Sequence, residues 1–308
     1  MELIYFDKYI QKEVFEDLVV AIGQFDGFHL AHMALLNKVK ERAKAIGAKT
    51  ALMTFDPHPD FVLKKNNDFT YITPLVDKAK SLAKLGFDYM IVIKFDLEVA
   101  GTDPEIFVKN YLTNILVKEV VVGFDFCFGY KGSGKANMIT ELSGGLVTTH
   151  IIDEIKYHDV KLGSTLIRGL LKEGKVEEVI DVMGHPYSIE AEVITGRKVG
   201  RTVNVPTANL RVSEKYVKIK KGVYGVIVTH NGIKYRGIAN YGHNPTFNFK
   251  EKATLEIHLL DFNGDLYGET IKVEFMIYLR DEVKFNSKEE FVEQINKDIS
   301  KTKKIINL

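Results

Sequence analysis

Residues Val19–Leu36 read VVAIGQFDGFHLAHMALL, and this stretch decides the fold of the first half of the chain. It begins as a short apolar strand, turns through Asp26-Gly27, and continues as an apolar helical pattern that carries His29 and His32. A helix that follows such a turn presents unpaired N–H groups and the positive end of its dipole. Histidines three residues apart share one face of a helix. The stretch therefore predicts a phosphate site.

On either side of this stretch, short apolar runs alternate with longer helical patterns as far as about residue 183. We predict strands at Val19–Ile22, Thr50–Thr54, Tyr89–Ile93 and Glu119–Gly123, and helices near 33–46, 74–86 and 104–117. This alternation is typical of an α/β domain in which helices cover both faces of a parallel sheet. Ligands bind beyond the carboxyl ends of the strands in such sheets.

Two further strand ends carry polar or aromatic residues. The second strand runs into the rigid turn Asp56-Pro57-His58-Pro59, and the fourth runs into the aromatic segment Phe124–Gly129. The following segment GYKGSGK, Gly129–Lys135, nearly matches a P-loop, but Ala136 stands where that motif needs Ser or Thr. We interpret it as a solvated loop, and the phenylalanines before it as suited to a flat ring.

The segment Leu162–Gly174, LGSTLIRGLLKEG, predicts a short helix that Ser164 or Thr165 caps and that ends at Gly174. Hydroxyls and the guanidinium of Arg168 near a helix start can bind phosphate. The alternative interpretation is an ordinary cap beside a surface arginine.

After Gly184-His185-Pro186 the composition changes to Val, Ile, Thr and Tyr with period-2 alternation. Asn231-Gly232 and Asn263-Gly264 each separate two such runs and predict hairpins. An antiparallel barrel or sandwich follows, and Ser287 with Glu290 predicts a capped final helix. We place the domains at 1–183 and 187–308.

Two features of the second half suggest chemistry. Thr207 and Asn209 are two apart on an extended chain, so their neutral oxygens face one side and can join a Mg²⁺ shell that substrate phosphates complete. Glu256 alternates with leucines on a strand and could serve as a general base. The alternative for Glu256 is a solvated sheet face.

Bulk properties exclude several classes of protein. The 308 residues carry a net charge of +1, with 42 basic and 41 acidic residues, and show no basic stripe for nucleic acid. One cysteine, Cys127, allows no intrachain disulfide. Neither a signal peptide nor an apolar run of membrane-spanning length is apparent, so we expect a cytoplasmic protein with no membrane partner. The sequence leaves its oligomeric state open.

Taken in order, these motifs resemble those of the bifunctional prokaryotic FAD synthetases, which join an FMN adenylyltransferase to a riboflavin kinase. The resemblance covers essentially the whole chain. It is carried by GQFDGFHLAH, TFDPHP, VVGFDFCFG, GSTLIR, GRTVNVPTANL, GVYGV, GIANYGHNPTF and LEIHLLDFNGDLYGE. It implies a Rossmann-like nucleotidylyltransferase domain followed by an antiparallel β-barrel domain with a terminal helix.

The resemblance implies two ATP-dependent reactions on small molecules, riboflavin to FMN in the barrel and FMN to FAD in the first domain, with Mg²⁺ as cofactor. The catalytic residues it implies are His29, His32, Arg168 and Glu256. The ATP-phosphate residues it implies are Gly23, Phe25, Ser164, Thr165, Gly196, Gly200 and Arg201. The flavin-binding residues it implies are Phe55, Pro57, His58, Asp125, Phe126 and Phe128. The metal ligands it implies are Thr207 and Asn209.

The sequence departs from the family pattern at Ala31, where glycine is usual between the histidines, and at Asn204, where the kinase loop usually has glycine. A helical Ala31 costs nothing, whereas a positive φ there costs roughly 1–2 kcal/mol. Cys127 stands where the family often has a basic residue. Two alternatives stay open: an adenylyltransferase whose barrel only binds flavin, and a flavin sensor without turnover.

Overall fold

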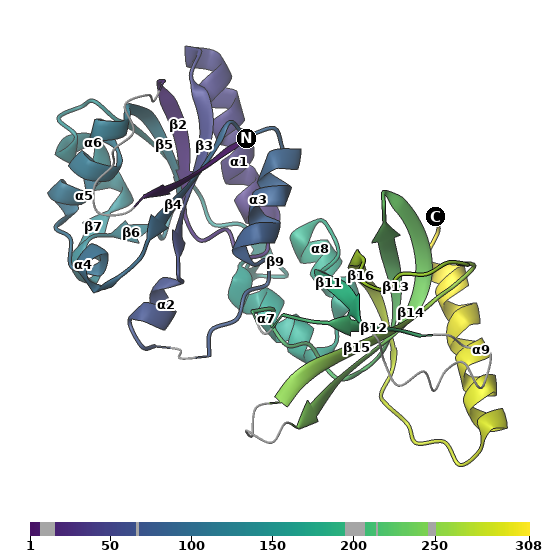
Figure 1. The fold of residues 1–308 in the computed structure, drawn as a ribbon. Helices are drawn as coiled ribbons and strands as arrows, with labels where there is room; N and C mark the ends of the chain where they lie inside the picture. Colours follow the sequence, from purple (N-terminus) through teal and green to yellow (C-terminus); the bar gives the residue numbers. More distant parts are fainter. Residues whose placement is uncertain (7–15, 66–67, 195–206, 214, 246–250) are drawn as a thin grey trace. The chain divides into compact units, whose positions relative to one another are not determined.

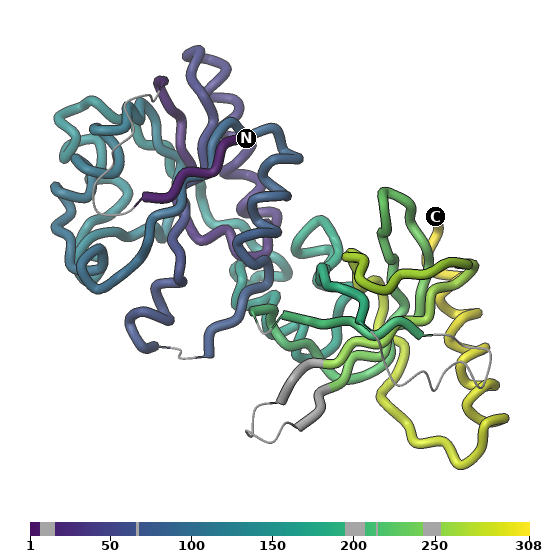
Figure 2. The backbone as a smooth tube through the Cα atoms, in the orientation of Figure 1, coloured from purple at the N-terminus to yellow at the C-terminus, as the bar shows by residue number. Residues whose placement is uncertain are grey.

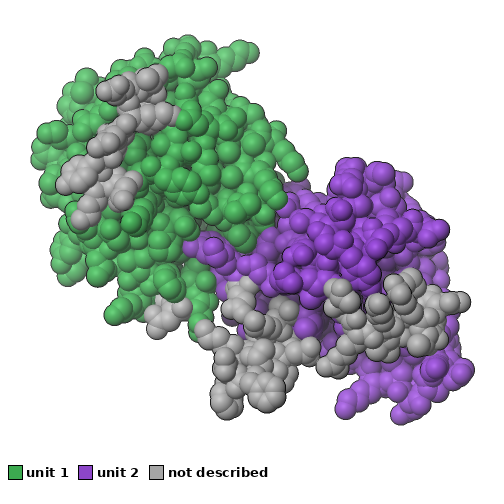
Figure 3. All heavy atoms as spheres, viewed as in Figure 1, with its two compact units in different colours: residues 1–69, 73–163 green, residues 70–72, 164–308 purple. Residues whose placement is uncertain are grey.

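The computed structural model describes residues 1–308 apart from 7–15, 66–67, 195–206, 214 and 246–250. The described residues form two compact units (Figure 3). Unit 1 comprises residues 1–69 and 73–163, and unit 2 comprises residues 70–72 and 164–308. The short segment 70–72 belongs to unit 2 because Tyr71 forms an isolated parallel bridge with Tyr216.

Unit 1 is built around a parallel sheet of six strands (Figure 1). In spatial order the strands are β1 (Glu2–Phe6), β4 (Tyr89–Lys94), β3 (Lys49–Asp56), β2 (Leu18–Ile22), β5 (Val117–Gly123) and β8 (Thr148–Ile152). The four predicted strands are confirmed, and the edge strands β1 and β8 were not predicted. All residues of β2 are buried. Because β2 pairs with β3 on one side and with β5 on the other, its carboxyl end lies in the middle of the sheet.

Helices cover both faces of this sheet, as predicted. Val19 and Ala21 of β2 pack with α1 (Leu30–Ile46) and α3 (Leu75–Lys84) in one buried cluster. Val20 and Ile22 point the other way, because successive side chains of a strand alternate, and they belong to the cluster that contains α5 (Pro104–Tyr111) and α6 (Ile139–Leu142). The short elements are α2 (Pro59–Val62), α4 (Leu97–Ala100), the 3₁₀ segments η1 (Thr113–Ile115), η2 (Tyr130–Gly132) and η3 (Ala136–Met138), and two small hairpins, β6 (Cys127–Phe128) with β7 (Gly134–Lys135) and β9 (Lys156–Tyr157) with β10 (Val160–Lys161).

The predicted helix near 104–117 is correct at its start and wrong at its end. Asp103 accepts a hydrogen bond from the Glu105 N–H at 2.8 Å, and Pro104 is the first helical residue. The helix stops at Tyr111, and Leu116 has a left-handed φ of 59° just before β5 begins. A left-handed residue cannot continue a right-handed helix, and apolar periodicity alone does not show such a break.

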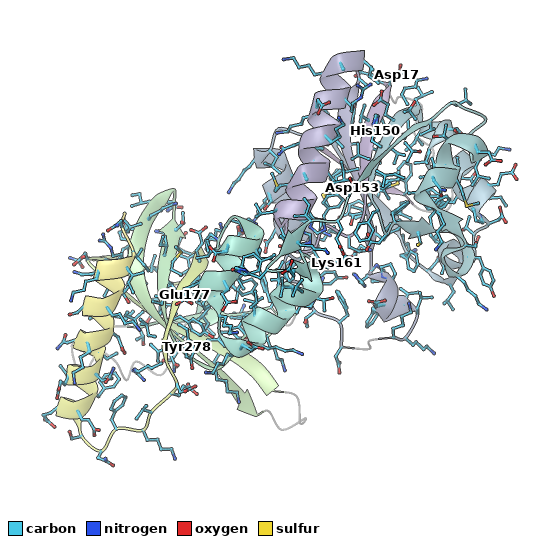
Figure 4. All side chains as sticks on the ribbon, turned by 180° about the vertical axis from the view of Figure 1, so that it is seen from behind. Asp17, His150, Asp153, Lys161, Glu177 and Tyr278 are labelled. Carbon is cyan, nitrogen blue, oxygen red and sulfur yellow. The ribbon has the colours of Figure 1, made fainter. Side chains whose placement is uncertain are left out.

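An ion-pair cluster surrounds the buried carboxylate of Glu119, which lies near the start of β5. Glu119, 6% exposed, accepts two hydrogen bonds of 2.8 Å from Arg42 of α1. Its other partner is His150 of β8, labelled in Figure 4, with Nε2 2.7 Å from the carboxylate. The hydrogen bond from Arg42 lowers the pKa of Glu119 despite its burial. The cluster ties α1, β5 and β8 together.

Unit 2 is a closed antiparallel barrel with helices around it, and the tube in Figure 2 traces its course. Around the barrel the strands are β11 (Ser188–Ile194), β12 (Ala208–Arg211), β15 (Glu251–Leu259), β14 (Ile233–Pro245), β13 (Gly222–His230) and β16 (Thr270–Arg280). Pairing of β11 with both β12 and β16 closes the ring. A barrel rather than a sandwich is therefore the outcome.

One predicted hairpin is confirmed and the other is wrong. Asn231-Gly232 joins β13 directly to β14, and the two strands pair along their length from His230 opposite Ile233. Asn263-Gly264 instead lies in a longer connection, since β15 ends at Leu259 and β16 begins at Thr270. β15 pairs with β12 and β14, and β16 pairs with β11 and β13. Closing the barrel takes precedence over the local turn signal.

Three helices complete unit 2. α7 (Ser164–Glu173) is followed by α8 (Val176–Met183), which contacts β16; Glu177 of α8 and Tyr278 of β16 are labelled in Figure 4. The terminal helix α9 (Lys288–Ile305) lies on β13, β14 and β16. Its predicted cap is confirmed, because Ser287 accepts a hydrogen bond from the Glu290 N–H at 3.1 Å.

Candidate active sites

The turn after β2 is tightly constrained. The Gly23 N–H donates to the Met53 carbonyl at 3.1 Å, and Phe25 behind it is fully buried. Phe25 and Phe28 have φ values of 47° and 46°, and Gly27 between them has 102°. Left-handed conformations at phenylalanine cost energy and persist only where the surroundings fix them. The backbone here is held in a shape that leads directly into α1.

The two histidines lie at the start of α1 in a way that the sequence did not predict. His29 is the N-cap rather than a helical residue, and its Nδ1 accepts a hydrogen bond from the His32 N–H at 3.3 Å. The rings stack with centroids 3.6 Å apart. Because Nδ1 is the acceptor, the proton of a neutral His29 lies on Nε2.

His32 is held neutral at physiological pH. Burial, the neighbouring His29 and the charge of Lys78 lower the pKa of His32 well below 6.5. Its Nδ1 atom is buried and has no hydrogen-bond partner among the described residues. A neutral imidazole still donates one N–H, so His32 can stabilise negative charge as a hydrogen-bond donor rather than as a cation.

Ala31 lies in the first turn of α1 and is helical, and it is not among the described residues with a positive φ. Alanine is the most favourable residue in a helix. The departure from the family's glycine therefore costs no backbone strain.

Lys78 lies under this turn and was missed in the sequence. It is 2% exposed, and its ammonium group donates hydrogen bonds to the Gln24 carbonyl and to Thr54 Oγ1. A sequence signal existed, because Lys78 falls with Leu75, Ala79 and Leu82 on the stripe of α3 that packs against the core. A lysine in an apolar stripe indicates a buried charge.

The second strand end contributes a rigid turn. The Asp56-Pro57 peptide bond is cis, and His58 caps α2 by accepting a hydrogen bond from the Asp60 N–H at 3.1 Å. The His58 ring stacks on Phe69 with centroids 3.9 Å apart. Phe55 is half-buried and meets Phe95 edge to face. These contacts account for the local structure, and a flavin-binding role for this turn stays a prediction.

The segment after β5 carries the other predicted flavin residues. Phe128 is 5% exposed and packs on Phe107 and Phe126, whereas Phe126 is only partly buried. The exposed Asp125 pairs with Lys161, which Figure 4 labels. Of the two phenylalanines, Phe126 is the more available to a ligand.

The predicted phosphate residues of the second motif lie on α7. The helix begins at Ser164, so Ser164 and Thr165 occupy its first turn, and Arg168 follows one turn later. All three belong to unit 2, whereas His29 and His32 belong to unit 1. That they act in one site with the histidines stays a prediction.

The barrel brings three polar residues side by side on its outer face. Glu256 lies opposite Asn209 on β12 and opposite Asn240 on β14. Leu255 and Ile257 on either side of Glu256 are buried in the barrel, so the carboxylate points outward. Directly opposed residues of antiparallel strands have Cβ atoms roughly 5 Å apart, close enough for their side chains to interact.

Asn240 was missed in the sequence, because no local signal sets the register of β14 against β15. Thr207 is described and half-buried, just before β12. The predicted residues Gly196, Gly200 and Arg201, and Asn204, lie outside the described part of the chain. Within that part no group of three or more His, Cys, Asp or Glu could hold a metal ion.

Comparison with known proteins assigns a different family model to each half of the chain. The family model described as FAD synthetase matches residues 11–166, and the one described as riboflavin kinase matches residues 183–306. A bifunctional riboflavin kinase/FMN adenylyltransferase from Listeria monocytogenes is 39% identical over 98% of this chain and 98% of its own length. Relatives of the same description from Bacillus subtilis and Escherichia coli K12 are 38% and 34% identical, over 91% and 92% of this chain and 90% and 91% of their own.

A solved structure described as a macrolide-efflux protein from Streptococcus pneumoniae has a TM-score of 0.91 and 29% identity, and the match covers 98% of each chain. In the described part of this chain no helix has the length and apolar character needed to cross a membrane. Because both family models and the curated relatives agree along nearly the whole sequence, the chain belongs to the family of bifunctional riboflavin kinase/FMN adenylyltransferases.

Proposed function

We propose that this chain is a transferase that phosphorylates riboflavin with ATP to give FMN, and adenylylates FMN with a second ATP to give FAD and pyrophosphate. The observation that carries the proposal is the presence of both family matches on one chain, one in each half. Both reactions consume ATP, which suits an enzyme of the cytoplasm.

We propose residues 1–183 as the adenylyltransferase domain and 187–308 as the kinase domain. The FAD synthetase match ends at residue 166, and the riboflavin kinase match begins at residue 183, close to the proposed boundary. Helices α7 and α8 pack in unit 2, yet α7 carries the predicted phosphate residues. The proposal is that α7 serves the adenylyl-transfer reaction although it packs with the barrel.

In the adenylyl transfer, a phosphate oxygen of FMN attacks the α-phosphorus of ATP and pyrophosphate leaves. The protein supplies positioning and charge stabilisation rather than covalent chemistry. The imidazole N–H groups of His29 and His32 and the N-terminus of α1 would donate to the phosphate oxygens on which charge develops. Ser164, Thr165 and Arg168 would bind the leaving pyrophosphate. Gly23 and Phe25 would shape the turn against the nucleotide, and the flavin ring would lie by Phe55 and Phe126.

In the kinase reaction, Glu256 would accept the proton of the ribityl hydroxyl as that oxygen attacks the γ-phosphorus of ATP. The exposed carboxylate on the outer face of the barrel is accessible to such a substrate. Thr207 and Asn209 fit a Mg²⁺ site, because both are partly exposed neutral oxygen donors and Asn209 lies opposite Glu256. When bound, the ion would neutralise charge on the ATP phosphates.

Incubation of the protein with riboflavin, ATP and Mg²⁺, followed by chromatography of the flavins, tests the proposal. We expect FMN to appear first and FAD to accumulate from it. FAD from FMN without FMN from riboflavin would instead support an adenylyltransferase whose barrel only binds flavin. Bound flavin with neither product would support a sensor.

A further inference from the structure

We propose that Lys78 is a positioning residue of the adenylyl-transfer site: its buried ammonium group fixes the Gln24 carbonyl and thereby the turn that presents the two histidines. The inference rests on the proposed adenylyltransferase function and adds a residue from α3 to it.

The burial of Lys78 is the first argument. Its side chain is 2% exposed, and it lies on the buried stripe of α3 together with Leu82. Lysine is almost never fully buried unless its charge is compensated, because removing an ammonium group from water is costly. An apolar side chain of similar length would fill the same space at lower cost. Packing therefore does not explain a lysine at this position.

The contacts of Lys78 supply the second argument. The Gln24 carbonyl accepts hydrogen bonds from the Lys78 ammonium group and from Thr54 Oγ1 at the end of β3. Lys78 also donates to Thr54 Oγ1 at 3.4 Å. Helix α3 and strand β3 thus converge on one carbonyl of the turn. The next residue is the strained Phe25, whose left-handed backbone needs such an external constraint.

The surrounding charges supply the third argument. The carboxylates of Asp26 after β2 and Asp56 at the end of β3 act on Lys78, but they only partly offset burial, and the pKa of Lys78 falls to about 8. The group is therefore mostly cationic at pH 7. Its charge is among the causes that lower the pKa of His32. Lys78 thus favours the neutral, donating form of His32 and places a positive charge near the anion-binding start of α1.

The decisive experiment compares Lys78→Met with Lys78→Arg, and uses Lys84→Met on the exposed face of the same helix as the matched control. For each variant we measure FAD formation from FMN, FMN formation from riboflavin, and Tm. We expect Lys78→Met to lose about 100-fold in kcat for FAD formation, the size of effect expected when a distant substitution misplaces a catalytic group by about 1 Å. FMN formation should stay at the wild-type rate, and Tm should be unchanged or higher. Lys78→Arg should regain part of the rate, and Lys84→Met should match wild type.

A titration separates positioning from mere structural support. We follow the His32 ring C–H signals by NMR in the full chain, without substrates, and expect the pKa of His32 to rise in Lys78→Met and not in Lys84→Met. An unchanged His32 titration, an unchanged rate of FAD formation, or equal loss of both activities with a lower Tm would each overturn the inference. Wild-type protein that makes no FAD would overturn the proposed function, whereas the titration tests Lys78 in either case.

Discussion

The imidazole rings of His29 and His32 stack with centroids 3.6 Å apart, one ring capping α1 and the other in its first turn. Two such rings cannot easily both carry a proton, and the nearby His29 is one of the causes that lower the pKa of His32. The pair therefore offers hydrogen-bond donors at a helix N-terminus rather than two cations.

His32→Ala should reduce FAD formation from FMN by about 10²–10³-fold, because it removes a preorganised donor from the developing phosphate charge. FMN formation from riboflavin should persist, since the proposed kinase residues lie in the barrel. Both rates are measured by chromatography on the same preparation. Equal loss of the two activities would contradict the assignment of separate sites.

The ring of His32 should remain neutral in the wild-type chain down through pH 6.5 and take up a proton only in more acidic buffer. The reason is that burial, the neighbouring His29 and the charge of Lys78 lower the pKa of His32 well below 6.5. The measurement follows the His32 ring C–H signals by NMR in the full chain without substrates, because the FMN phosphate itself titrates at about pH 6 and would change the rate of FAD formation. A titration midpoint near pH 6.5 would show that His32 titrates normally.

Glu256→Gln should slow FMN formation by about 10²–10⁴-fold, the range for removal of a general base, and should spare FAD formation from FMN. Glutamine keeps the size of the side chain on the outer face of β15, so the barrel should remain intact. The measurement is the initial rate of riboflavin phosphorylation at saturating ATP. A kinase rate near wild type would exclude Glu256 as the base.

Asn240→Asp should shift the kinase pH profile because Asn240 lies directly opposite Glu256. A second carboxylate at roughly 5 Å repels the charge on Glu256, so a proton is retained there to higher pH. The acid limb of the pH profile of kcat/KM for riboflavin should therefore move to higher pH. Asn263→Asp, an exposed position in the connection between β15 and β16, adds the same charge and should leave the profile unmoved.

The sequence could predict what local patterns determine. The apolar strand Leu18–Ile22, the capped helices after Asp103 and Ser287, and the Asn231-Gly232 hairpin all follow from side-chain periodicity and turn chemistry. It could not predict pairings that depend on distant strands. Asn263-Gly264 failed as a hairpin signal because β15 and β16 each pair with other strands.

The same limit applies to the sites. His29, His32, Asn209 and Glu256 were found because motifs carry them. Asn240 was not, since only the register of β14 and β15 places it opposite Glu256. Lys78 was not, although its place on the apolar stripe of α3 was visible, because only tertiary packing shows that it meets Gln24.

Lys78→Met should make the protein more stable near neutral pH while it slows FAD formation. The pKa of Lys78 is about 8 in the folded chain and 10.5 without the fold, so ionisation of Lys78 opposes folding. The penalty is complete below pH 8, where both states are protonated, and amounts to at most about 3 kcal/mol. Between pH 8 and pH 10.5 the unfolded chain binds more protons at Lys78 than the folded chain does. The free energy of unfolding of the wild type therefore rises relative to that of Lys78→Met as pH rises.

Calorimetric unfolding at pH 7 and pH 10 measures this difference, with the two units free to unfold in separate transitions. At pH 7 the Lys78→Met transition should lie at or above the wild-type temperature, and the gap should narrow by pH 10. Lys84→Met should show no such pH dependence, because Lys84 is exposed on the same helix. If Lys78→Met were destabilised equally at both pH values, Lys78 would support the fold through packing. The burial of its charge would then be no argument for a role in FAD formation.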